Sequence, residues 1–128
     1  MVAPIIPGLN DSEIPAILEA AKNAGAQSAH SVLLRLPLTV EPVFLEWLQR
    51  TQTDKSDRIL SRIRSCREGA LNDPQFGSRM RGSGTIAGQI QDMFNVFSRK
   101  YGLDSPLPGL NHELFAPPRP SSGQMRFC

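Results

Sequence analysis

The chain has 128 residues, of which 40% are hydrophobic and 20% are charged, a composition that suits one domain with a modest core. Its formal charge of +2 is unremarkable and by itself indicates no class of partner. Because no apolar run approaches the roughly 18 residues of a membrane span and no signal-peptide pattern opens the chain, we expect a cytoplasmic protein without a membrane partner.

The charges are distributed unevenly along the chain. Residues 1–49 carry 2 basic and 5 acidic side chains, residues 50–83 carry 8 and 4, and residues 84–128 carry 4 and 3. The middle segment is therefore net +4. A basic segment of this kind suits contact with phosphate or nucleic acid, although at this charge density it is more often an ordinary solvated face.

The opening stretch, VAPIIPGLND, is typical of a strand that ends and leads into a helix. Residues 2–6 are mostly apolar, and the two prolines of the stretch, which lack an N–H, indicate where strand pairing fails. Gly8 permits a positive φ or the close approach of a ligand to the backbone. Asn10 and Asp11 are candidate helix caps, and Asn10 with Glu13 has the spacing of a capping box.

A helix to about Asn23 and a second strand over residues 31–36 follow. From Val32 to Leu36 the strand is apolar apart from Arg35, as expected for a parallel strand covered by helices. Strand, helix and strand then form one βαβ unit. Two parallel strands do not make a stable sheet alone, so we expect further strands from a preceding segment.

Three helices are predicted beyond this unit, over residues 41–50, 54–66 and 85–101. A loop rich in glycine, asparagine and proline separates the last two, and Gly102 is the expected stop. From residue 105 onward prolines and small polar residues dominate, which predicts an extended or disordered tail.

Several segments together resemble one protein family: MVAPIIPGLND, EIPAILEAA, VLLRLP, LSRIRS, LNDPQFGSRMRGSG and the last helix. The chain resembles, from residue 1 to about 103, the C-terminal portion of radical SAM proteins related to spore photoproduct lyase, a group often described as DNA-repair photolyase-like. The resemblance implies an α/β fold, the C-terminal part of a partial (β/α)6 barrel. Residues 1–39 would be its last strand–helix–strand unit, residues 40–103 a helical extension, and residues 104–128 an extended or disordered tail.

Members of this family bind a 4Fe–4S cluster through a C-x-x-x-C-x-x-C loop and cleave S-adenosylmethionine to a 5′-deoxyadenosyl radical. This sequence lacks that loop, since Cys66 and Cys128 are 62 positions apart. The resemblance therefore implies that the cluster and S-adenosylmethionine belong to a full-length parent. This chain alone would bind neither and would be inactive, and its partner would be the N-terminal half of the barrel.

The resemblance also implies candidate site residues. The carboxyl ends of barrel strands face the site, and we expect Ile6, Gly8 and Leu36 at the wall that contacts the adenosyl group. The competing interpretation is that Ile6 and Leu36 are ordinary core residues and Gly8 a turn residue.

Three arginines are candidates for substrate or phosphate binding. Arg35 lies in an otherwise apolar strand, so it needs either a structural ion pair or the carboxylate of a substrate or cofactor. Arg79 and Arg81, in the stretch GSRMRGSG, either bind a phosphate-bearing substrate or pair with acidic residues and a helix end.

Two functional hypotheses follow. The first is a fragment of a radical SAM enzyme whose substrate, a small molecule or a nucleic acid, is unknown. The alternative is a non-catalytic interaction module that binds phosphate or nucleic acid through its arginine-rich middle.

Overall fold

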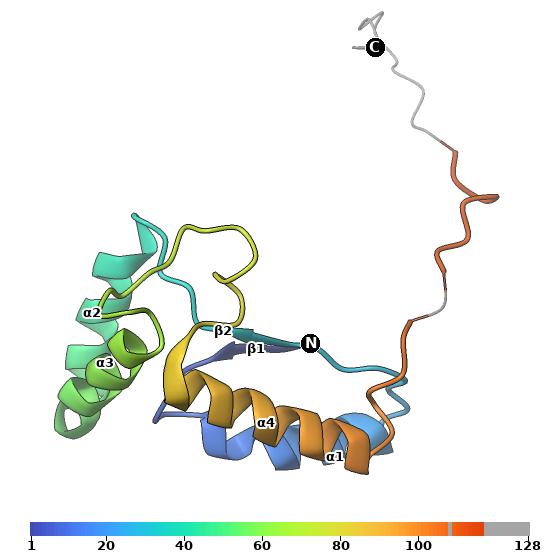
Figure 1. Ribbon diagram of the computed structural model, residues 1–128, viewed down its shortest axis with the longest axis horizontal. Coiled ribbons are helices and arrows are strands. Elements are labelled where there is room, and N and C mark those ends of the chain that lie inside the picture. Colours follow the sequence, from blue (N-terminus) through green and yellow to red (C-terminus); the bar gives the residue numbers. More distant parts are fainter. Residues whose placement is uncertain (108, 117–128) are drawn as a thin grey trace, which may run out of the picture.

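A computed structural model describes residues 1–107 and 109–116 (Figure 1). Within these residues the chain forms two strands, four α-helices and two short 3₁₀ helices, in the order β1 (Val2–Ile5), η1 (Asp11–Glu13), α1 (Ile14–Asn23), β2 (Ser31–Leu33), α2 (Val40–Thr51), η2 (Thr53–Lys55), α3 (Ser56–Ser65) and α4 (Gly84–Lys100). The predicted α/β class is confirmed, whereas a barrel around it stays a prediction.

β1 and β2 run parallel and are joined through α1, as the predicted strand–helix–strand unit requires. Both strands are shorter than predicted. The Leu34 N–H still donates to the Ile5 carbonyl (2.8 Å), but the first strand then turns away at Pro7. Arg35 and Leu36 consequently have no neighbouring strand in the described part of the chain.

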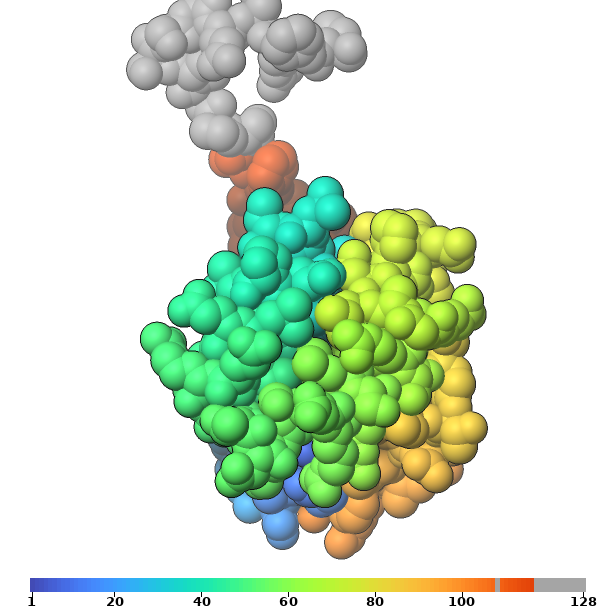
Figure 2. Space-filling model, turned by 90° about the vertical axis from the view of Figure 1, so that its left-hand side faces the viewer, coloured from blue at the N-terminus to red at the C-terminus, as the bar shows by residue number. Residues whose placement is uncertain are grey.

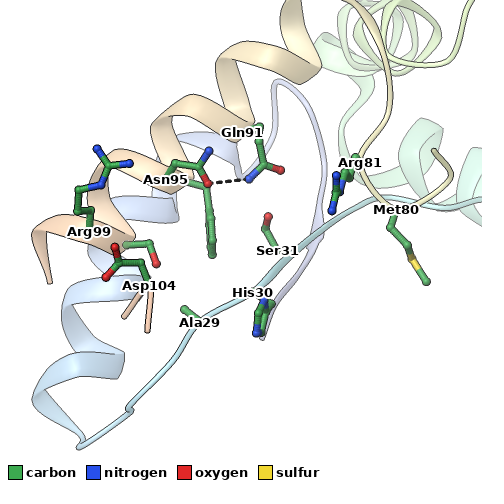
Figure 3. A pocket seen from close by; sticks show the side chains of 11 residues that line it. Ala29, His30, Ser31, Met80, Arg81, Gln91, Asn95, Arg99 and Asp104 are labelled. Carbon is green, nitrogen blue, oxygen red and sulfur yellow. Dashed lines mark hydrogen bonds between the residues drawn. The ribbon is translucent and has the colours of Figure 1, made fainter. Parts of the chain in front are cut away.

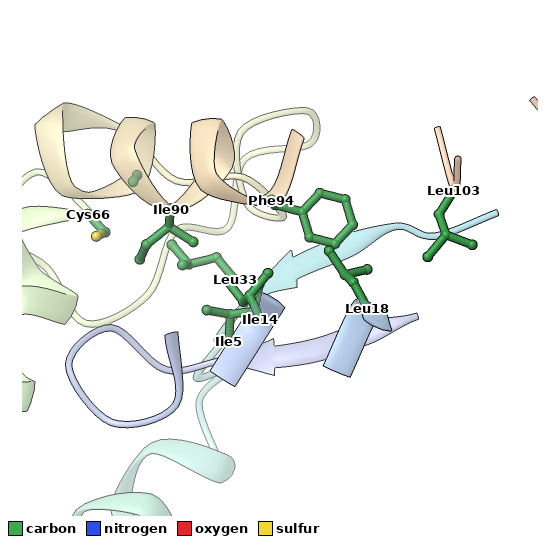
Figure 4. Close-up of a cluster of buried hydrophobic side chains, with 9 residues drawn as sticks. Ile5, Ile14, Leu18, Leu33, Cys66, Ile90, Phe94 and Leu103 are labelled. Carbon is green, nitrogen blue, oxygen red and sulfur yellow. The ribbon is translucent and has the colours of Figure 1, made fainter. Parts of the chain in front are cut away.

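α1 and α4 cover one face of this sheet (Figure 1). Side chains from both strands and both helices meet there in a buried cluster, and Figure 4 shows that they point into the space between α4 and the strands. The cluster consists of Ile5, Ile14, Leu18, Leu33, Cys66, Ala87, Ile90, Phe94 and Leu103.

A second buried cluster lies beyond the carboxyl ends of the strands, where α2 and α3 pack. It consists of Ile6, Leu34, Leu36, Leu48, Ile59 and Ile63. Figure 2 views the molecule from this end, where α2, α3 and the segment that follows α3 form the surface. α2 and α3 therefore hold the strand ends, whereas α4 covers the middle of the sheet.

The other face of the sheet is open. Ile5 and Leu33 belong to the cluster on the covered face, whereas their neighbours Pro4 and Val32 do not. β1 has a register irregularity between Val2 and Ile5, so its side chains do not alternate strictly. Pro4 is exposed and Val32 half-buried. Figure 1 shows α1 and α4 on one side of β1 and β2, and no helix of the described residues on the other side. The outer edge of β1 likewise pairs with no strand of the described part. The sheet thus has one uncovered face, and the outer edge of β1 is unpaired within the described residues.

The predicted tail is described only in part. Residues 104–107 and 109–116 contain no helix or strand, and residues 117–128, with Cys128, lie outside the described residues. Among the helices that are described, none combines the length and the apolar character needed to cross a membrane.

Candidate functional site

The carboxyl ends of β1 and β2 bring four predicted site residues to one edge of the sheet. Because the strands are parallel, the residues after each strand emerge at the same edge. Ile6 and Gly8 follow β1, and Arg35 and Leu36 follow β2. This edge is therefore the first candidate site.

Two side chains fix the turn that follows β1. Asn10 Oδ1 accepts from the Ile6 N–H (2.7 Å), and Asn10 Nδ2 donates to the Pro4 carbonyl (3.1 Å). Asp11 Oδ1 accepts from the Gly8 N–H (3.0 Å), and Gly8 has φ +83°. The predicted cap at the start of the helix is therefore wrong, because both side chains bond backward to the strand end and not forward into the helix.

The space beside Gly8 is filled by α3. A Cβ atom at Gly8 would lie 2.8 Å from Arg62 Cδ, and Arg62 Nη1 lies 3.9 Å from Asp11 Oδ2. Ile6 and Leu36 are only 9% and 1% exposed, within the second cluster. All three residues predicted for the cofactor wall are thus covered by the chain's own side chains, and their contact with a cofactor stays a prediction.

A buried arginine that sequence reasoning missed lies behind this edge. Arg67 is 4% exposed, and its Nη2 donates to the Leu34 carbonyl (2.8 Å). Its Nε and Nη1, and the Nε of the half-buried Arg35, have no acceptor among the described residues. Burial lowers the pKa of Arg67, and the nearby charge of Arg35 acts in the same direction. The helical period could have revealed it, since Ile59, Ile63 and Arg67 are spaced by four residues.

A small cavity of about 210 Å³ adjoins Arg67. Asp73 lies on its wall, where its carboxylate accepts from the Ser78 hydroxyl and the Gln75 N–H. These two bonds lower the pKa of Asp73. Asp73 supplies negative charge near Arg67 without an ion pair, because the one ion pair found across the described residues joins Arg62 to Asp11.

A larger groove, of about 510 Å³, runs along the outer edge of β2 and is called the β2-edge groove below. Figure 3 shows side chains of α4 on one side and the chain around Ser31 on the other. Its lining residues are Ala29, His30, Ser31, Met80, Arg81, Gln91, Phe94, Asn95, Ser98, Arg99 and Asp104.

The two loop arginines that were predicted to bind a phosphate lie in different surroundings. Arg81 is exposed and lines the β2-edge groove. Arg79 does not line it, and its guanidinium lies 5.0 Å from the centre of the Phe76 ring. Neither forms an ion pair with an acidic residue of the described part. The structure therefore associates Arg81, and not Arg79, with a site.

Cys66 is a free thiol that is fully buried in the first cluster. Burial raises its pKa, which disfavours the thiolate that a metal requires. Elsewhere in residues 1–107 and 109–116, no group of three His, Cys, Asp or Glu side chains is placed to hold a metal ion.

Comparison with known proteins adds no family: no family model, curated protein or solved structure matches the chain. The features of the described residues that bear on function are the open sheet face, the strand-end edge and the β2-edge groove.

Proposed function

We propose that this chain forms the C-terminal part of a radical SAM enzyme and completes one side of its partial (β/α)6 barrel. The observation that carries the proposal is the open face of the sheet. Helices cover one face, while Pro4 and Val32 lie on the other. Strands of an α/β barrel share this asymmetry, because helices cover the outside and the inner face closes on the other strands.

The unpaired edge of β1 supports the same proposal. A preceding parallel strand would pair there, and its crossover helix would cover the apolar groove that lies along this edge. That groove is lined by Val2 and Ile17, among others, and Ile17 of α1 is 39% exposed. A barrel neighbour would bury this surface.

The described residues do not fit a cluster site, because the one described cysteine is enclosed by hydrophobic side chains. A preceding segment would hold the cluster, and no step through it is assigned to this chain. S-adenosylmethionine would supply the radical chemistry typical of the family. Asn10, Asp11 and Arg62 would keep the strand ends in position around it.

The test begins with the reading frame upstream of the codon for Met1, which should encode a C-x-x-x-C-x-x-C loop. The full-length protein, reconstituted anaerobically, should show cluster absorbance and cleave S-adenosylmethionine.

Val32→Asp in that protein should lower cleavage at least tenfold while cluster absorbance is retained, because it places a charge on the inner face. Val96→Asp, at a position that is 59% exposed on α4, is the matched control and should leave cleavage unchanged.

Two results would overturn the proposal. One is an upstream frame without the cysteine loop. The other is a 128-residue chain that by itself holds stoichiometric iron and sulfide and cleaves S-adenosylmethionine.

A further inference from the structure

The outer edge of β2 is paired at both ends and open in the middle. The Leu33 N–H donates to the Met80 carbonyl (2.9 Å), and the Ala29 N–H donates to the Leu103 carbonyl (2.8 Å). Ser31 lies between these two points, opposite Val2 of β1. The β2-edge groove lies along this gap.

The backbone of Ser31 faces this groove. The Val2 N–H donates to the His30 carbonyl (2.8 Å). The backbone hydrogen-bonding groups of the residues before and after Ser31 therefore point toward β1. In a parallel ladder consecutive residues alternate, and the N–H and C=O of Ser31 therefore point away from β1. They offer one donor and one acceptor at the centre of the groove.

The gap is too short for a further strand. Four residue steps separate Ala29 from Leu33, about 13 Å of extended chain, and Met80 and Leu103 already occupy both ends. The volume of about 510 Å³ lies within the range of about 300–1,000 Å³ typical of small-molecule sites. A small molecule is therefore the occupant that fits.

The charge of the groove differs between its two ends. Figure 3 shows Arg81 and His30 beside Ser31, whereas Arg99 lies at the far end near Asp104. Neither arginine forms an ion pair among the described residues, but Asp104, the one acidic residue of the lining, lies at the Arg99 end. The end next to Ser31 is thus the positive one.

The wall formed by α4 is polar and partly pre-arranged. Gln91 Nε2 donates to Asn95 Oδ1 (2.9 Å), which orients both amides and leaves Gln91 Oε1 and Asn95 Nδ2 for a ligand. Ser98, which is 3% exposed, and the buried ring of Phe94 complete the floor. A ligand with hydroxyl or amide groups beside its charged group would match this wall.

We propose that the β2-edge groove binds a small molecule through an oxyanion group, a phosphate or a carboxylate, held by the Arg81 guanidinium and the Ser31 N–H. Arginine holds such groups through charge-assisted hydrogen bonds, and the backbone N–H adds a fixed donor. The sequence had Arg79 and Arg81 as candidates for phosphate binding. This proposal puts the binding site in the β2-edge groove, which Arg81 lines and Arg79 does not. It does not depend on the radical SAM proposal.

The test is a backbone-amide NMR titration of the 128-residue chain with inorganic phosphate and, separately, with acetate, at constant ionic strength. We expect saturable shifts at Ser31 and Asn95 with at least one anion, and the tighter anion identifies the charged group. Arg81→Gln should weaken binding about tenfold, the loss expected for one charge-assisted contact. Arg81→Lys keeps a point charge but loses the planar fork of donors, so it should weaken binding less than Arg81→Gln does.

Arg64→Gln is the matched control, since Arg64 is an exposed arginine of α3 outside the groove, and it should bind like the unmodified chain. Equal weakening in Arg64→Gln and Arg81→Gln, shifts that do not saturate, or unchanged binding in Arg81→Gln would each overturn the proposal. The titration uses neither cluster nor S-adenosylmethionine, so its failure is distinct from failure of the radical SAM proposal.

Discussion

Gly8 is the residue at which backbone conformation and side-chain packing are restricted together. Its φ of +83° disfavours any residue with a Cβ, and the Arg62 side chain lies where that Cβ would be. From the sequence, Gly8 had two possible roles, a positive φ or the close approach of a ligand. The structure shows the positive φ, with the Arg62 side chain beside the residue, and contact with a ligand stays a prediction.

Replacement of Gly8 by alanine should lower the free energy of unfolding by about 1–2 kcal/mol from the positive φ alone. Displacement of Arg62 from Asp11 adds a smaller loss, at most about 1 kcal/mol for a partly exposed pair. Gly25→Ala is the matched control, because Gly25 has φ +90° and nothing within 4 Å of the added Cβ. Urea denaturation measures both variants.

In an Arg62→Ala background, the additional cost of Gly8→Ala should disappear and the two glycine variants should become equal. An undiminished difference would contradict the packing explanation.

The buried position of Arg67, like the conformation of Gly8, involves contacts with residues that are distant in the sequence. Its buried guanidinium has one hydrogen bond, to the Leu34 carbonyl of the chain after β2, and two nitrogens without an acceptor in the described part. A buried cation of this kind is costly unless partly neutralised, and the charge of Asp73 acts in that direction. Arg67 therefore ties the end of α3 to the end of the sheet.

The junction between β1 and α1 is held by side chains that a helix would normally use as caps. Asn10 spans the junction with two bonds, one to the Ile6 N–H and one to the Pro4 carbonyl. The helix start itself is a short 3₁₀ turn, η1, without a side-chain cap from the described residues. The hydrogen bonds of Asn10 therefore stabilise the turn between β1 and α1 and not the first turn of the helix.

Asn10→Ala should lower the free energy of unfolding by about 1–2 kcal/mol, because it leaves the Ile6 N–H, part of a buried residue, without its acceptor. Asn10→Asp keeps the acceptor and loses the donor, so its loss should be intermediate. Asn23→Ala, at an exposed site of α1, should change stability by less than about 0.5 kcal/mol. Thermal unfolding followed by circular dichroism would contradict this if Asn10→Ala and Asn23→Ala melted together.

The arrangement of the helices leaves the molecule unequally covered. α1 and α4 protect one sheet face, α2 and α3 protect the strand ends, and the edge of β1 remains open in the described part. An open strand edge beside apolar side chains is a template for pairing with another chain. Self-association of the 128-residue chain is the expected consequence.

Sedimentation velocity should show a mass that rises with protein concentration. Ile17→Lys places a charge beside the open edge and should shift the chain toward monomer, whereas Val96→Lys, on exposed α4 surface, should not. A chain that stays monomeric at all accessible concentrations would contradict the prediction. Equal effects of the two lysines would also contradict it.

The sequence by itself determined the elements whose signals are local. Apolar periodicity indicated the helices, and glycine fixed ends such as that of α4, where Gly102 has φ +63°. The βαβ unit followed from two apolar strands with a helix between them. The shortening of β2 did not follow, because Arg35 and Leu36 read as strand until the departure of β1 removes their neighbour.

Only the tertiary structure decided what the polar residues contact. Asn10 had two possible directions for its hydrogen bonds, and the turn at Gly8 selected the backward one. The helical period of Ile59, Ile63 and Arg67 indicates that Arg67 is buried, but only the packing against the chain after β2 supplies its partner, the Leu34 carbonyl. Arg81 became part of a groove only because α4 lies along β2. Local patterns fix backbone conformation, whereas partners for charge and hydrogen bonds come from residues distant in sequence, which no local pattern specifies.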